Sequence, residues 1–146
     1  MTEPVLEVRG LTKHFPARQG LLGHKRTWVR AVDGVDFAIH AAETLGLIGE
    51  SGCGKTTTSK LILLQEAPTA GTIAFEGRDI AGLGGKDLMA YRRAVQVVFQ
   101  DPFSSLNPRM RVLVNDAAPT EIHTGLSRGA IAERVAVVLE LVGLPP

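Results

Sequence analysis

A glycine-rich run with a lysine near its end, Gly49-Glu-Ser-Gly-Cys-Gly-Lys-Thr56, carries the clearest chemistry in the sequence. The run matches the pattern G-x-x-x-x-G-K-[ST]; an apolar stretch precedes it and a helix-forming stretch follows it. Its glycines allow backbone conformations closed to other residues, so successive N–H groups can turn inward around an anion. The pattern therefore predicts a phosphate-binding loop.

The positions of this loop predict distinct roles toward a nucleoside triphosphate. A helix that begins at Lys55 presents its positive dipole end to the phosphates, and the Lys55 ammonium reaches the β- and γ-phosphates. Thr56 offers a hydroxyl to Mg²⁺, and Thr57 is placed to hydrogen-bond the α-phosphate. Cys53 contributes its backbone N–H alone, because the sequence places no base beside it. The expected nucleotide-binding residues of the loop are Gly49, Ser51, Gly52, Cys53, Gly54, Lys55, Thr56 and Thr57.

Strand and helix patterns alternate around the loop and predict an α/β fold. A loop or hairpin insertion is expected between the first two strands, over Pro16–His24, and a turn is expected at Glu76-Gly77. Ser127 is a plausible N-cap for a last amphipathic helix, whose apolar face holds Ile131, Val135, Val138, Leu139 and Val142. The expected strands are Val5–Arg9, Val32–Ile39, Thr44–Ile48, Gly71–Phe75 and Val95–Phe99, and the earlier expected helices are Lys55–Gln65 and Lys86–Arg93.

Bulk composition limits the classes of partner. With 146 residues, of which 45% are hydrophobic, the chain has enough apolar material for one compact domain. A formal net charge of +1 is too small to suggest nucleic acid as the main partner, and no nucleic acid is expected among the partners. No acid lies between Glu7 and Asp33, where several basic residues fall, so this stretch is either a solvated basic loop or a contact for phosphates or an anionic surface.

Cysteine usage and the N-terminus predict a cytoplasmic location. Cys53 is the only cysteine and cannot form an internal disulfide, and the start Met-Thr-Glu-Pro lacks the character of a secretory signal. No uninterrupted apolar run approaches the roughly 18 residues that cross a bilayer. If the protein works at a membrane, another component is expected to anchor it.

The phosphate loop alone does not distinguish kinases, GTPases and transport ATPases. The segment Val97–Met110, which reads VVFQDPFSSLNPRM, makes the distinction. Together with the glycine loop, it resembles the Q-loop of ATP-binding-cassette (ABC) proteins, in the version found in oligopeptide and dipeptide permease ATPases. Further stretches are similar to that subfamily in order and spacing: AVDGVDFAI, ETLGLIGESGCGKTT, APTAGTIAFEGRDI and LELVGLPP. The resemblance covers nearly the whole chain. A GTPase is disfavoured, because no Asn-Lys-x-Asp segment occurs.

This resemblance implies a P-loop NTPase fold of the ABC ATPase type with an N-terminal antiparallel β subdomain. Residues 1–100 are then the nucleotide-binding core, and residues 101–146 are the Q-loop and the start of a helical subdomain. The implied function is ATP-driven import of oligopeptides or dipeptides. Three alternatives stay open: an ABC importer for nickel or another solute, a drug-export cassette, and an inactive nucleotide-binding fragment.

The resemblance also assigns roles outside the glycine loop. Gln100 is expected to touch Mg²⁺ or its water through the amide oxygen, with an ordinary loop amide as the alternative. Phe15 falls where the family stacks an aromatic residue on adenine, and a core phenylalanine is the alternative. Asp101–Met110 is the implied docking segment for membrane-spanning permease subunits, with Phe103 and Arg109 as contacts.

Other implied partners are a second ATP-binding subunit and, indirectly, an extracytoplasmic solute-binding protein, at the cytoplasmic face of the cell membrane. The LSGGQ signature, the Walker B aspartate, the following glutamate and the switch histidine are absent from the sequence. Asp101, Asp116 and Glu140 follow apolar residues, but each lacks the context of a catalytic carboxylate. We therefore expect a truncation product or a partial reading frame, inactive on its own and stopping before the C-terminal part of the fold.

Overall fold

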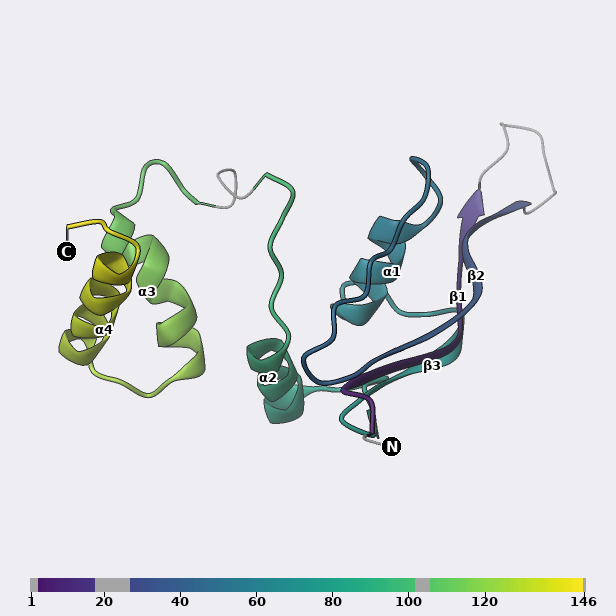
Figure 1. Ribbon diagram of the computed structural model, residues 1–146, viewed down its shortest axis with the longest axis horizontal. Helices are drawn as coiled ribbons and strands as arrows, with labels where there is room; N and C mark the ends of the chain where they lie inside the picture. Colours follow the sequence, from purple (N-terminus) through teal and green to yellow (C-terminus); the bar gives the residue numbers. More distant parts are fainter. Residues whose placement is uncertain (1–2, 18–26, 102–105, 146) are drawn as a thin grey trace. The chain divides into compact units, whose positions relative to one another are not determined.

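The computed structural model describes residues 3–17, 27–101 and 106–145 of the chain (Figure 1). The chain forms two compact units, residues 1–84 and residues 85–146, and each unit is described by itself. The functional division that we placed at residue 100 stays a prediction.

An antiparallel sheet with the strand order β2-β1-β3-β4 forms the frame of the first unit (Figure 1). The central strand β1 pairs with β2 on one side and with β3 on the other. The β1–β2 pairing runs from Leu6 opposite Ile39 to Ala17 opposite Thr27, so the two strands reach further than the sequence pattern indicated. Of the loop expected over Pro16–His24, Pro16 and Ala17 belong to β1, and residues 18–24 lie outside the described residues. The strands are β1 (Leu6–Ala17), β2 (Thr27–Ile39), β3 (Ala70–Phe75) and β4 (Arg78–Asp79).

The turn between β3 and β4 confirms the expected Glu76-Gly77 turn. Both residues have a positive φ, 49° for Glu76 and 74° for Gly77. Two successive left-handed residues are typical of the tight turns that match the twist of a hairpin. The turn thus sets the short β3–β4 pairing, in which Phe75 lies opposite Arg78.

The core of the first unit joins the sheet to the helix α1 (Lys55–Ile62). Leu11 of β1 and Leu61 of α1 are fully buried, and α1 contacts β2. Burial of one such leucine stabilises a fold by about 1.5–3 kcal/mol. The helix ends three residues earlier than the expected Gln65, and Leu64 beyond it has a left-handed backbone, with φ 54°.

Two expected strands are wrong. Thr44–Ile48 forms no strand, and Ile48 is 96% exposed; Val95–Phe99 forms none either, and Val98 is 87% exposed. A strand exists only when a neighbour accepts and donates its backbone hydrogen bonds, and such apolar runs suit strands flanked on both sides. Within the described residues, no neighbouring strand pairs with either segment.

The first helix of the second unit, α2 (Gly85–Ala94), covers the expected Lys86–Arg93. Asp87 lies in its first turn and two arginines lie in its last turn, an arrangement that complements the helix dipole. Tyr91 is 5% exposed, and burial raises the pKa of its hydroxyl to about 12. The phenol is therefore neutral throughout the physiological pH range.

The helices α3 (Val112–His123) and α4 (Arg128–Leu141) pack against each other through Ala117, Ile131 and Val135. The Ser127 hydroxyl accepts a hydrogen bond from the backbone N–H of Ala130, which confirms the predicted N-cap. The expected apolar face is only partly confirmed, because Leu139 packs on this cluster whereas Val138 is 49% exposed and Val142 is 65% exposed.

The helix α3 was not expected from the sequence, and Asp116 lies within it. The sequence gives no clear signal for α3, because Pro119 lies inside the helix and proline removes a backbone hydrogen-bond donor.

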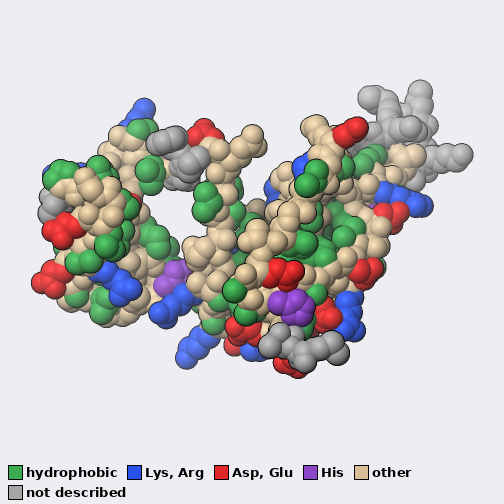
Figure 2. Space-filling model, in the orientation of Figure 1, with side chains coloured by type: hydrophobic (Ala, Val, Ile, Leu, Met, Phe, Trp, Pro, Cys, Tyr) green, Lys and Arg blue, Asp and Glu red, His purple; other side chains and the backbone are tan. Residues whose placement is uncertain are grey.

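Large apolar side chains also reach the surface of both units, where Figure 2 shows hydrophobic groups among the charged ones. Leu141 is the most exposed large apolar residue of α4, at 80%. None of the described helices is both long enough and apolar enough to cross a membrane.

Candidate nucleotide-binding site

The glycine loop owes its shape to backbone conformations that other residues avoid. Gly52 has φ 85° and Gly54 has φ 100°, both in the left-handed region. Gly54 is also the N-cap of α1, and a Cβ atom built on it would collide with the carbonyl oxygen of Ala31 in β2. Glycine is required at position 54 both by its φ and by this close approach. The sheet therefore fixes where the loop turns into the helix.

The Lys55 ammonium closes the loop. Nζ donates hydrogen bonds to the carbonyl oxygens of Gly49, at 2.6 Å, and Glu50, at 2.7 Å, and lies 3.4 Å from Sγ of Cys53. A Cβ atom built on Gly49 would lie 2.6 Å from that sulfur, so a side chain there would require the Cys53 side chain to shift. The chain thus curls around its own lysine, at the N-terminal end of α1.

The first turn of α1 presents hydroxyl groups and carries no acidic side chain. Thr56 is exposed and Thr57 is half-buried, so the first can meet a ligand freely. Thr58 is different: it is 5% exposed, and its hydroxyl donates to the carbonyl oxygen of Gly54 at 3.1 Å. We did not single out Thr58 from the sequence, although its spacing of three from the buried Leu61 signals an inward position.

The donor set suits Mg²⁺ bound together with phosphates. Among the described residues, no group of three His, Cys, Asp or Glu side chains could hold a metal ion. An exposed threonine hydroxyl at a helix N-terminus is a hard oxygen ligand, and Mg²⁺ is commonly bound by few protein oxygens with phosphate and water. Thr56 fits this role.

Phe15 lies in the same unit as the loop. In the β1–β2 pairing it is opposite Val29, two residues before Ala31, the residue that contacts Gly54. Its ring is half-buried, and the Lys13 ammonium lies 4.8 Å from the ring centroid. The register thus brings Phe15 to the strand that supports the phosphate loop, while stacking on adenine stays a prediction.

Gln100 is exposed and belongs to the second unit, so its expected contact with Mg²⁺ stays a prediction. Phe103 lies outside the described residues. Arg109 is exposed, and its backbone N–H donates to Oδ1 of Asn107. Docking of Asp101–Met110 on permease subunits likewise stays a prediction.

Two asparagines that sequence reasoning missed hold the end of this docking segment. The backbone N–H of Asn107 donates to Oδ1 of Asn115 at 3.2 Å, and Nδ2 of Asn115 donates to the carbonyl oxygen of Asn107 at 3.1 Å. Asn115 lies on α3, so the reciprocal pair attaches the segment to that helix. No local pattern signals a pair formed across eight residues.

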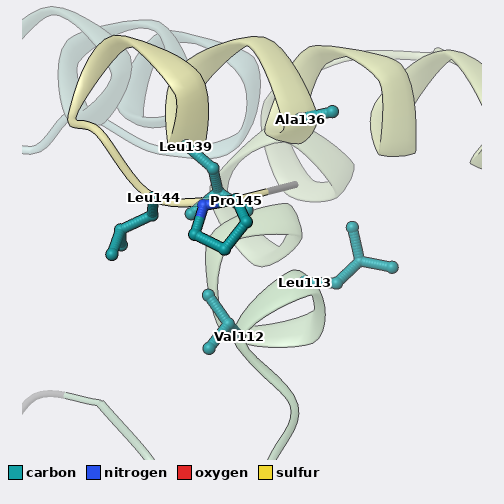
Figure 3. Close-up of a pocket in the computed structure, with 6 residues that line it drawn as sticks. All are labelled: Val112, Leu113, Ala136, Leu139, Leu144 and Pro145. Carbon is teal, nitrogen blue, oxygen red and sulfur yellow. The ribbon is translucent and has the colours of Figure 1, made fainter.

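A pocket of about 400 Å³ lies beside α3 and α4 (Figure 3). Figure 3 shows Val112 and Leu113 below, with Leu139, Leu144 and Pro145 above them. None of its lining side chains is polar or charged, so the pocket lacks the groups that catalysis requires. The lining residues are Val112, Leu113, Ala136, Leu139, Leu144 and Pro145.

The glycine loop, its lysine and the helix behind them define a P-loop protein. The family model described as "ABC transporter" matches residues 32–146, well over half of the chain. The chain therefore belongs to the ABC transporter family.

Curated relatives match the chain along its whole length. It is 44% identical over 146 residues to the "Probable peptide ABC transporter ATP-binding protein y4tS" of Sinorhizobium fredii, covering 100% of this chain and 41% of that protein. It is 43% identical over 145 residues to the "Oligopeptide transport ATP-binding protein AppF" of Bacillus subtilis, covering 99% of this chain and 44% of that protein. The chain thus spans less than half the length of these relatives.

Solved structures confirm the fold. The ATP-binding cassette MJ0796, in a dimeric post-hydrolysis state bound to ADP and Pi, matches with a TM-score of 0.73 at 23% identity, over 95% of this chain and 57% of that one. The structure of cbiO1 from Clostridium perfringens, part of the ABC transporter complex cbiONQ, matches with a TM-score of 0.68 at 24% identity, over 98% of this chain and 52% of that one. The ABC ATPase fold expected from the sequence, with its antiparallel β subdomain, is confirmed.

Proposed function

We propose that the chain is the nucleotide-binding part of an ABC importer subunit that couples ATP binding and hydrolysis to uptake of oligopeptides or dipeptides. The observation that carries this proposal is the position of the Lys55 ammonium inside the curled glycine loop, 2.6 Å and 2.7 Å from two loop carbonyls. An ammonium held in the loop attracts the negatively charged phosphates of a nucleotide. The backbone N–H groups of the loop and the positive end of the α1 dipole attract the phosphates as well.

The substrate class is supported by the relatives. Their printed names describe peptide, oligopeptide and, for GsiA of Salmonella typhimurium at 45% identity, glutathione transport. Glutathione is itself a tripeptide, so these names share one substrate chemistry. An importer of another solute, such as nickel, and an inactive nucleotide-binding fragment remain the alternatives.

The proposed partners are membrane-spanning permease subunits, a second ATP-binding subunit and, indirectly, a solute-binding protein. Asp101–Met110 would face the permease, at the cytoplasmic side of the membrane. Mg²⁺, when bound, would neutralise phosphate charge, and Thr56 and Gln100 would hold it. Thr57 would form a hydrogen bond with the α-phosphate. The backbone N–H groups of the loop would come from Gly49, Ser51, Gly52, Cys53 and Gly54.

Titration of the chain with a fluorescent ATP analogue and Mg²⁺ tests the proposal. Lys55→Ala should lower the affinity at least about tenfold, because a hydrogen bond to a charged group contributes about 1.5–3 kcal/mol. Lys60→Ala is a matched control, since Lys60 is an exposed lysine on the same helix. Equal affinities of the wild type and Lys55→Ala would show that the loop is not the site.

A further inference from the structure

Lys13 is an enclosed lysine next to the candidate base-binding residue. Its side chain is only 13% exposed. Nζ donates to the carbonyl oxygen of Ala67 at 2.8 Å and lies 3.1 Å from Oε2 of Glu66. The same ammonium lies 4.8 Å from the centroid of the Phe15 ring. It therefore bridges the ring to the chain segment that follows α1.

The segment that holds Lys13 is itself bonded to β1. The backbone N–H of Thr69 donates to the carbonyl oxygen of Thr12 at 2.8 Å, and the backbone N–H of His14 donates to the Thr69 hydroxyl at 3.0 Å. An isolated surface ion pair contributes little, because both side chains stay mobile. Here the chain segment that carries both acceptors is attached to β1 by hydrogen bonds to the residues on either side of Lys13.

The contacts of Lys13 connect the candidate base-binding residue, Phe15, with the helix α1 that carries the phosphate loop at its start. The helix α1 starts at the phosphate loop, and the N–H groups of Gln65 and Glu66 return to the carbonyl oxygen of Lys60 in its last turn. Lys13 therefore joins the Phe15 ring to the segment that leaves the same helix. A shift of either element would break the contacts of the ammonium.

We propose that Lys13 is a positioning residue that fixes the Phe15 ring for stacking against the base of the bound nucleotide. The proposal rests on the function proposed above. A cation is attracted to the face of an aromatic ring, so the ammonium holds the ring orientation and leaves the opposite face for the base. A ring that is ordered before binding loses less conformational freedom when the base stacks on it.

Calorimetric titration with Mg-ATP and with Mg-tripolyphosphate, which has the phosphates but no base, tests the proposal. Lys13→Met should weaken ATP binding about two- to fivefold and leave tripolyphosphate binding unchanged. Lys13→Arg should restore ATP binding, because a guanidinium also packs on an aromatic face. In Phe15→Ala, which lacks the ring, adding Lys13→Met should cause no further loss of ATP affinity.

The outcomes separate this inference from the proposed function. An equal loss of ATP and tripolyphosphate binding in Lys13→Met, or no loss of either, would overturn the positioning role while Lys55-dependent binding still stands. Full additivity of Lys13→Met and Phe15→Ala would overturn it as well. If the wild type binds neither ligand, both the proposed function and the inference fail. Lys60→Met serves as the matched control and should bind both ligands as the wild type does.

Discussion

The carbonyl oxygen of Ala31, in β2, occupies the space that a Cβ atom on Gly54 would need. Because Gly54 is also the N-cap of α1, this contact connects the sheet directly to the start of the phosphate site. The β2 strand and the phosphate loop are therefore packed directly against each other at this point. A side chain at position 54 would push them apart.

Gly54→Ala should destabilise the first unit and abolish nucleotide binding. Gly82 is a matched control, because it has φ 73° but a methyl group added there would meet nothing within 4 Å. Gly82→Ala should cost about 1–2 kcal/mol from left-handed strain alone, and Gly54→Ala about 1–3 kcal/mol more from the collision. Urea unfolding followed by tryptophan fluorescence measures both. Equal losses in the two variants would contradict the contact with Ala31.

Tyr91 should make stability depend on pH in the alkaline range. Burial raises its pKa in the folded protein to about 12, above the ordinary value of 10.0, so the unfolded chain loses the phenol proton first. Its contribution is fully present below pH 10 and is lost as the pH rises through 12, by up to about 2 kcal/mol. Tyr91→Phe should remove this part of the pH dependence, which chemical unfolding at about pH 9 and about pH 11.5 would measure. An unchanged slope in the variant would refute it.

The chain of residues 1–146 should bind ATP without steady turnover. Its sequence has no signature motif, no Walker B aspartate with its following glutamate and no switch histidine, and hydrolysis requires carboxylates for the metal and the attacking water. Phosphate release should therefore equal that of Lys55→Ala, measured in parallel. Steady release that disappears in Lys55→Ala would point to Asp101 or Asp116 as a catalytic carboxylate.

Local sequence signals predicted the elements that depend on nearby residues. The glycine loop, the helix from Lys55, the Glu76-Gly77 turn and the Ser127 cap all follow from residue types within a few positions. Thr44–Ile48 and Val95–Phe99 could not be judged in this way, because strand formation depends on partners elsewhere in the chain. The contact between Ala31 and Gly54 could not be predicted from the sequence either, because it depends on the register of the β-sheet.

The pairing of β1 with β3 also determines when the site can form. In this pairing Leu6 lies opposite Phe75. The chain between Ile39 and Ala70, which connects β2 to β3, carries both the phosphate loop and α1. Pairings between distant residues form slowly, because closing a long loop costs entropy before any contact offsets it. The β1–β2 hairpin, which holds Trp28, the single tryptophan, is more local and should form first. On refolding, tryptophan fluorescence should therefore recover before the capacity to bind a nucleotide.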